Sequence, residues 1–156
     1  KSATTGSGSP PGSEPTDMAV YELHVRDFSA MDSSVPPELR GKYGAFGASH
    51  SHAVKHLTAL AGAGLTHVHL LPCYDFGSVP EREQHQATVD HDALAQCASD
   101  SDEQQAAVAR VANHDAYNWG YDPVHYGVPE GSYATDPDGA RRVLEFRQMV
   151  SDLAAV

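Results

Sequence analysis

The sequence predicts an α/β fold in which one helix links two parallel strands. Residues 18–28 alternate between two sets of side chains, as a β-strand does. Residues 53–61 then repeat apolar side chains at helical spacing, and residues 66–72 form a second short apolar run after a glycine-rich stop. Strand, helix and strand over about fifty residues make a βαβ unit, whose strands must run parallel.

Composition limits the class of protein and its partners. At 156 residues, with 40% hydrophobic residues, the chain is long enough for one domain with its own core. A formal charge of −11 disfavours nucleic acid and anionic membranes as partners, and no run approaches the roughly 18 apolar residues of a membrane span. Cys73 and Cys97 make no metal motif, and we expect no bond between them.

Order is expected to begin at residue 18. Residues 1–17 are rich in Ser, Gly, Thr and Pro and have almost nothing to bury, so they are predicted to be a disordered linker that follows another domain. The first strand then presents a polar face, which suits either a strand that ends at a cleft or a satisfied ionic network. The side chains of that network would be Glu22, His24, Arg26 and Asp27.

Helix signals recur along the chain. After a loop over residues 31–47, Ser49 or Ser51 can cap the first helix. Its His52 and His56 are four residues apart, but without further converging ligands we expect surface histidines and no metal site. Residues 73–116 are a long polar connection with one helix at 102–111. Ser101 is its predicted cap, and Gln104 is predicted to complete a capping box with Ser101.

The last helix is predicted to start near residues 135–137, with Thr135 or Asp136 as the cap and Pro137 in the first turn. It should run to the end of the chain. A stripe of apolar residues at helical spacing should face the core. The stripe consists of Val143, Phe146, Met149, Val150 and Leu153.

Residues 117–133 are predicted to be a loop with an unusual number of aromatic rings. Two interpretations stay open: the rings form an apolar plug over the core, or they stack on a flat, amphipathic ligand such as a sugar. Gly120 has no side chain and would let the backbone bend so that the adjacent ring faces a cleft.

Five stretches together resemble one known family. They are YELHVRDFS at 21–29, RGKYGAF at 40–46, AGLTHVHLLP at 63–72, YNWGYDP at 117–123 and VPEGSYATDP at 128–137. These resemble type I pullulanases and limit dextrinases, the starch-debranching branch of the α-amylase family (glycoside hydrolase family 13). The resemblance implies an incomplete (β/α)8 TIM barrel, since a complete one takes about 250 residues. Residues 18–156 would be its N-terminal fragment, with the first two to three β/α units and a long loop insertion after the second strand.

The resemblance also implies an activity for the parent protein. It would cleave α-1,6-glucosidic bonds in pullulan, amylopectin or limit dextrins with retention, which needs a nucleophilic and an acidic carboxyl group. In this chain Tyr121 would stack on the sugar in subsite −1, with Trp119 and Asp122 shaping the subsite. The catalytic carboxylates belong to later strands, so the chain alone is predicted to be inactive. Glu130, Asp136 and Asp138 are expected in turn or helix-dipole roles.

Partners and location follow from the same resemblance. The expected partners are an α-glucan and the remainder of the barrel, which a stable fold would need. No cofactor is expected for this chain, and a calcium requirement is left open only for the parent enzyme. Residues 101–108 resemble plant limit dextrinases, which favours a plastid. The alternatives are a non-catalytic α-glucan-binding module that uses Trp119, Tyr121 and Tyr126, or the remnant of a truncated gene.

Overall fold

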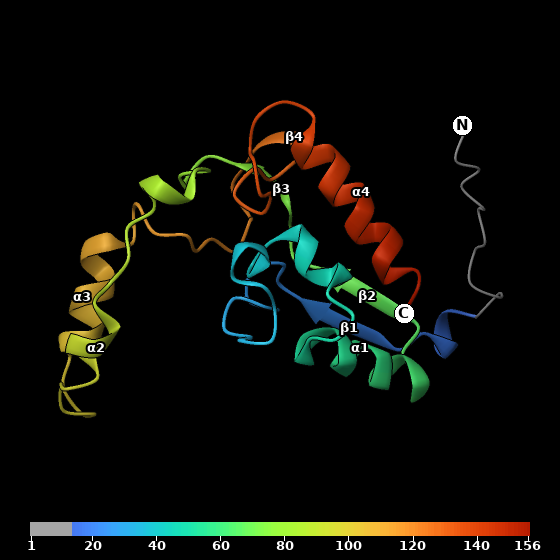
Figure 1. The fold of residues 1–156 in the computed structure, drawn as a ribbon, viewed down its shortest axis with the longest axis horizontal. Coiled ribbons are helices and arrows are strands. Elements are labelled where there is room, and N and C mark those ends of the chain that lie inside the picture. Colours follow the sequence, from blue (N-terminus) through green and yellow to red (C-terminus); the bar gives the residue numbers. More distant parts are fainter. Residues whose placement is uncertain (1–13) are drawn as a thin grey trace.

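The predicted βαβ unit is confirmed in a computed structural model, which describes residues 14–156. Strand β1 (Val20–Leu23) and strand β2 (His67–Leu70) are parallel and are joined by helix α1 (His52–Gly62), as Figure 1 shows. Most of the predicted linker, residues 1–13, lies outside the described residues. The remainder of it includes a 3-10 turn, Pro15–Asp17, with no buried residue.

Strand β1 is shorter than predicted, because the chain turns directly after Leu23. The N–H of Phe28 donates to the carbonyl of His24 at 3.0 Å, so the backbone leaves the sheet although buried Val25 continues the alternation. The expected ionic network forms in part, since Arg26 pairs with Asp27 at 3.0 Å. Glu22 stays outside it, because the parallel register places it opposite a histidine of β2, His69, with which it pairs at 3.2 Å.

Helix α1 begins where three side chains satisfy its first N–H groups. Ser51, the predicted cap, accepts from the N–H of Val54 at 3.1 Å. Asp32 accepts from the N–H of Ala53 at 2.9 Å, and Ser34 accepts from the N–H of His52 at 2.8 Å. Two of these caps come from the loop after β1, so that loop is fixed to the start of the helix.

The prediction of a continuous loop over residues 117–133 is wrong for residues 123–129. Strand β4 (Pro123–Pro129) pairs antiparallel with strand β3 (Tyr74–Phe76), with register shifts between the paired residues. The glycine and prolines suggested a loop, but the two prolines stand at the strand ends, where a missing N–H is tolerated. Pairing with a distant strand therefore overrides the local signals.

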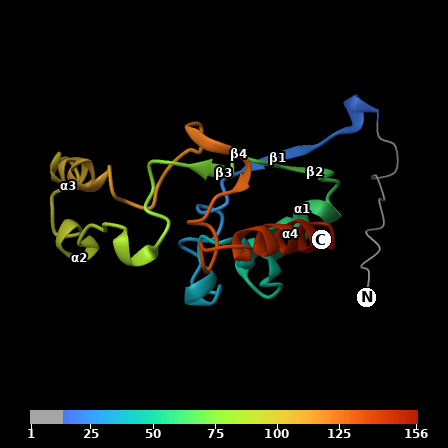
Figure 2. The same ribbon diagram turned by 90° about the horizontal axis from the view of Figure 1, so that it is seen from above.

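Residues 83–116, which we call the arm, project from the rest of the molecule (Figures 1 and 2). The arm contains a 3-10 turn (Glu83–His85) and the helices α2 (His91–Leu94) and α3 (Glu103–Val111). The N–H of Ala87 donates to the carbonyl of His114 at 2.6 Å, so the two chain segments that lead to α2 and from α3 meet at this point. The predicted capping box of α3 is wrong, because the Gln104 side chain bonds back to Ser101 at 3.1 Å and to Ala98 at 3.1 Å.

Helix α4 (Arg141–Leu153) starts later than predicted. The N–H of Thr135 donates to Glu145 at 2.8 Å, and Asp136 accepts from the N–H of Asp138 at 3.0 Å. Thr135 thus bonds to a side chain within α4, and its hydroxyl donates to the same Glu145 carboxylate, whereas Asp136 closes a turn that precedes the helix. The predicted apolar stripe divides: Met149 is fully buried, Phe146 and Leu153 pack against the core, and Val143 and Val150 stay exposed.

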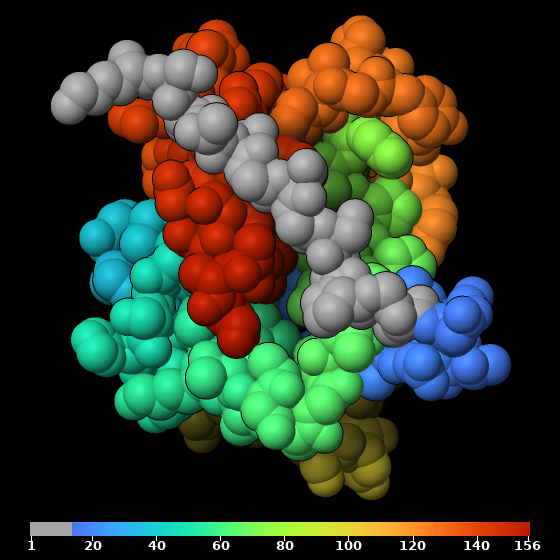
Figure 3. Space-filling model, turned by 90° about the vertical axis from the view of Figure 1, so that its right-hand side faces the viewer, coloured from blue at the N-terminus to red at the C-terminus, as the bar shows by residue number. Residues whose placement is uncertain are grey.

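The core lies between the β1–β2 pair and helices α1 and α4, which cover the same face of these strands (Figure 2). The two helices lie next to each other on the face shown in Figure 3. The RGKYGAF stretch forms a 3-10 turn (Tyr43–Gly47) that contributes two of the core residues. The buried core consists of Leu23, Val25, Tyr43, Phe46, Leu57, Phe76, Val79, Tyr133, Ala134 and Met149.

The fold is thus mixed α/β, and the four strands of residues 14–156 form two separate two-stranded sheets without barrel closure. Cys73 and Cys97 are both free, as predicted, and burial raises the pKa of Cys73 to about 11. In the described part of the chain, no helix has both the length and the apolar character needed to cross a membrane.

Candidate functional site

The segment of residues 117–122, which we call the aromatic loop, lies at the carboxyl ends of both parallel strands. His24 follows β1 directly, and its Nε2 lies 2.6 Å from the backbone oxygen of Asn118. Pro72 follows β2 and lies against Gly120. Loops at the carboxyl ends of parallel strands are where α/β proteins place their ligand sites. The aromatic loop is therefore the candidate site of this chain.

Gly120 allows the close approach of the loop to β2. Its φ is +84°, in the left-handed region, and a Cβ at this position would lie 2.2 Å from the carbonyl oxygen of Pro72. Its N–H donates to the side-chain oxygen of Asn118 at 2.6 Å, which closes a tight turn. The predicted need for glycine here is confirmed, for both a conformational and a steric reason.

The aromatic rings of residues 117–133 differ in their burial. Tyr133 is in the core, with 2% of its surface exposed, whereas Trp119 and Tyr121 are 58% and 70% exposed. Tyr117 connects the loop to the protein: its ring stacks on His24 with centroids 5.7 Å apart and meets Trp119 edge-on at 5.8 Å. The plug interpretation therefore holds for Tyr133, and Trp119 and Tyr121 are free to meet a ligand.

Asp122, the third predicted site residue, is held at the end of the loop. Its carboxylate accepts from the side-chain amide of Asn118 at 3.3 Å and from the hydroxyl of Ser78. The sequence interpretation overlooked both partners. Asn118 precedes Gly120 by two residues, and an asparagine in that position is a signal for a side-chain-closed turn. Ser78 lies two residues after β3, and no local signal links it to the loop.

The carboxylates outside the loop are engaged in structural contacts. Glu130 is fully buried and accepts from the N–H groups of Phe76 at 3.0 Å and Ser132 at 2.7 Å, which joins β3 to the end of β4. Burial raises the pKa of Glu130, and these two hydrogen bonds oppose the rise. Asp136 closes a turn, as predicted, and Asp138 pairs with Arg82.

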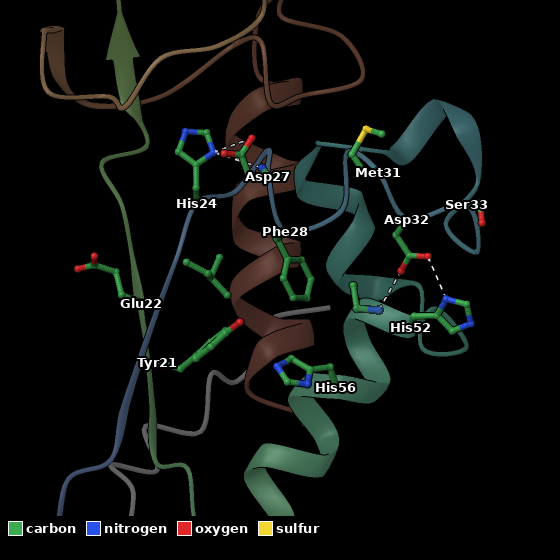
Figure 4. Close-up of a pocket in the computed structure, with 12 residues that line it drawn as sticks. Tyr21, Glu22, His24, Asp27, Phe28, Met31, Asp32, Ser33, His52 and His56 are labelled. Carbon is green, nitrogen blue, oxygen red and sulfur yellow. Dashed lines mark hydrogen bonds and ion pairs between the residues drawn. The ribbon is translucent and has the colours of Figure 1, made fainter. Parts of the chain in front are cut away.

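A cleft of about 630 Å³ runs along β1, the turn after it and α1, and His24 is one of its lining residues (Figure 4). His52 lines it and lies 3.5 Å from Asp32, and His56 packs edge-on against Tyr21. Trp119, Tyr121 and Asp122 do not line this cleft. Across residues 14–156, no group of three or more His, Cys, Asp or Glu side chains is placed to hold a metal ion. The cleft is therefore not the candidate site.

Known proteins were compared with this chain by sequence and by structure. No family model matches the sequence. Pullulanase 1, chloroplastic, from Arabidopsis thaliana is 52% identical over 138 residues, which cover 88% of this chain and 14% of that protein. Pullulanase from Klebsiella pneumoniae is 40% identical over 165 residues, which cover 85% of this chain and 15% of that protein.

Solved structures agree. The crystal structure of Klebsiella pneumoniae pullulanase complexed with maltotriose matches with a TM-score of 0.77 and 39% identity, over 86% of this chain and 16% of that one. The chain thus spans only about one sixth of the length of the proteins it matches. By both sequence and structure, this chain is similar to a partial region of these larger pullulanases.

Proposed function

We propose that residues 18–156 are the N-terminal part of the (β/α)8 catalytic barrel of a starch-debranching glycoside hydrolase, preceded by a linker at residues 1–17. The enzyme cleaves α-1,6-glucosidic bonds in pullulan, amylopectin or limit dextrins with retention. This chain supplies the aromatic loop, in which Tyr121 stacks on the sugar in subsite −1 and Trp119 and Asp122 shape that subsite. No cofactor is assigned to this chain, and any calcium ion belongs to the parent enzyme.

One observation carries the proposal: Trp119 and Tyr121 are exposed on a loop fixed at the carboxyl ends of two parallel strands. An exposed aromatic face can cover the apolar face of a glucose ring, while nearby polar groups such as Asp122 bond its hydroxyls. A related pullulanase has been crystallised with maltotriose, an α-glucan, which supports this class of ligand.

The bond-breaking groups are assigned to the rest of the barrel. Retaining hydrolysis needs two carboxyl groups about 5 Å apart, one on each side of the scissile bond. The buried Glu130 already accepts two backbone hydrogen bonds, and Asp122 is held by Asn118 and Ser78. These carboxylates position the chain rather than attack a sugar.

The open structure of the β1–β2 pair supports a need for the rest of the barrel. Within residues 14–156 each of these strands has only one partner, so each leaves one edge unpaired. Apolar side chains such as Val150 stay exposed on α4. A closed barrel pairs every edge and covers these helices. We therefore expect the isolated chain to be marginally stable, and a sharp cooperative melting transition of the isolated monomer would contradict this.

The proposal is tested by kinetics in the full-length enzyme. Tyr121→Ala should lower kcat/KM for pullulan by about 10- to 100-fold, the loss expected for one stacked ring. Tyr126→Ala is the matched control, since Tyr126 is also exposed but lies outside the aromatic loop on β4. Equal effects of the two variants, or no cleavage of pullulan by the wild type, would refute the proposal.

The isolated chain distinguishes the proposal from a non-catalytic glucan-binding module. A module should bind maltotriose by calorimetry and lose affinity with Tyr126→Ala as well as with Trp119→Ala. The proposal instead predicts no release of reducing ends from pullulan and no independent glucan binding.

We also propose a plastid location, supported by the chloroplastic relative from Arabidopsis thaliana. Recovery of the protein outside the plastid fraction would contradict that part.

A further inference from the structure

We infer that His24 is the positioning residue of the aromatic loop: its Nε2–H holds the backbone carbonyl of Asn118 and so fixes the loop that carries Tyr121. The inference rests on the proposed function of Tyr121 for its consequence in catalysis. It concerns a residue that acts through the loop and does not itself touch the substrate.

The position of His24 suits this role. It follows β1, the first strand of the βαβ unit, and only 7% of its surface is exposed. Its ring stacks on Tyr117 with an angle of 25° between the planes and meets the buried Tyr133 edge-on. His24 therefore lies between a rigid part of the core and the exposed loop (Figure 4 shows it at the end of β1).

The hydrogen bonds of His24 define which nitrogen carries the proton. The carbonyl of Asn118 can only accept, so Nε2, 2.6 Å away, must donate. The N–H of Asp27 can only donate, so Nδ1, 3.3 Å away, must accept. The hydroxyl oxygen of Tyr133 lies 3.1 Å from Nε2 and accepts from the same N–H. The contacts with Asn118 and with the N–H of Asp27 therefore select the tautomer with the proton on Nε2.

Asn118 transmits this constraint to the rest of the loop. While its backbone oxygen is held by His24, its side-chain oxygen accepts from the N–H of Gly120 at 2.6 Å. Its side-chain amide reaches Asp122 at 3.3 Å. Tyr121 lies between these two contacts, so its backbone is held on both sides by groups that Asn118 orients. Loss of the His24 hydrogen bond would release this assembly from β1.

A double-mutant cycle in the full-length enzyme tests the inference. His24→Phe keeps a ring but removes the donor, and should lower kcat/KM for pullulan about tenfold, which corresponds to about 1.4 kcal/mol. His24→Gln restores an N–H donor and should recover most of this loss. His69→Phe is the control, because the His69 side chain is 65% exposed on β2 and makes no contact with the loop in the described structure.

The cycle separates positioning from a general effect on folding. If His24 acts through the loop, the His24→Phe effect should largely vanish in the Tyr121→Ala background, because the ring it positions is absent. Fully additive effects, or a His24→Gln variant as impaired as His24→Phe, would overturn the inference. A wild type that does not cleave pullulan would instead refute the proposed function.

A second measurement needs no substrate. In hydrogen exchange of the full-length enzyme, the backbone N–H groups of the aromatic loop should exchange faster in His24→Phe than in the wild type, and His24→Gln should restore the slower exchange. Exchange of the loop that is equally fast in the wild type and in His24→Phe would overturn the inference, whatever the activity of the enzyme.

Discussion

Two glycines with the same backbone conformation allow steric and conformational effects to be separated. Gly120 has a φ of +84° and Gly127 has a φ of +85°, so an alanine is strained at either position. Their surroundings differ: a Cβ on Gly120 would lie 2.2 Å from the oxygen of Pro72, whereas a Cβ on Gly127 would meet nothing within 4 Å. Gly127→Ala is therefore a matched control for Gly120→Ala.

The expected magnitudes follow from these contacts. Holding alanine in the left-handed conformation costs about 1–2 kcal/mol, and this is the whole effect expected of Gly127→Ala. In Gly120→Ala the loop must also move away from Pro72 until the Cβ reaches the 3.0 Å below which real contacts are essentially never found. A forced backbone shift of that kind adds about 1–3 kcal/mol. Gly120→Ala should thus destabilise the protein by about 2–5 kcal/mol.

Both variants are compared in the same full-length background by calorimetric unfolding and by kcat/KM for pullulan. Gly120→Ala should show the lower transition temperature and the larger loss of kcat/KM, because the displaced segment carries Tyr121. Both variants replace glycine by alanine, so the effect of this change on the unfolded chain is the same in each and cancels in the difference between them. Equal losses of stability and activity would show that the contact with Pro72 does not restrict the loop.

Three further changes test the packing around the site. The Ser34 hydroxyl and two backbone N–H groups lower the pKa of Asp32 from 3.8 to about 2. Its contribution to stability is thus complete above about pH 4 and is lost as the pH falls through about 2. The gap in melting temperature between the wild type and Asp32→Asn should close over that range, and a constant gap would contradict the assignment. Arg142→Ala removes hydrogen bonds to Glu81 at 2.8 Å and to the Pro137 carbonyl at 2.8 Å. It should cost about 1.5–3 kcal/mol in denaturant unfolding, and Arg141→Ala, at the exposed start of α4, should cost less. Leu57→Ala removes most of a side chain that is only 2% exposed and leaves a cavity, so it should lower the free energy of unfolding by about 2–5 kcal/mol in the same measurement. Leu144→Ala should have little effect, because Leu144 is exposed.

Local signals predicted α1 well, because its boundaries depend on neighbouring residues. Ser51 caps the first turn, and the helix ends at Gly62, close to the predicted stop. The start of α4 was predicted too early for a related reason. Thr135 and Asp136 are good caps by residue type, but Thr135 bonds to Glu145 within the helix and Asp136 closes a preceding turn. Residue type identifies a potential cap, and only the surrounding contacts decide whether it caps a helix.

Features that depend on distant partners could not be predicted in this way. Strand β4 forms because β3, nearly fifty residues earlier, offers it an edge, as the pairing of Asp75 with His125 illustrates. The contact between His24 and Asn118 joins residues separated by 94 positions, and no pattern in either stretch indicates it. The motif YNWGYDP did locate the exposed rings, because the character of that loop depends on consecutive residues.

The hydrogen bond between Ala87 and His114 at the base of the arm bears on how this region can change during evolution. Because the chain leaves and re-enters the domain at one point, the segment between these residues can grow or shrink without moving β3 or the aromatic loop. The entropic cost is small, since doubling the length of a flexible loop costs only about 0.6 kcal/mol. The arm is therefore a natural insertion site, where new surfaces can be added beside the aromatic loop while that loop keeps its shape.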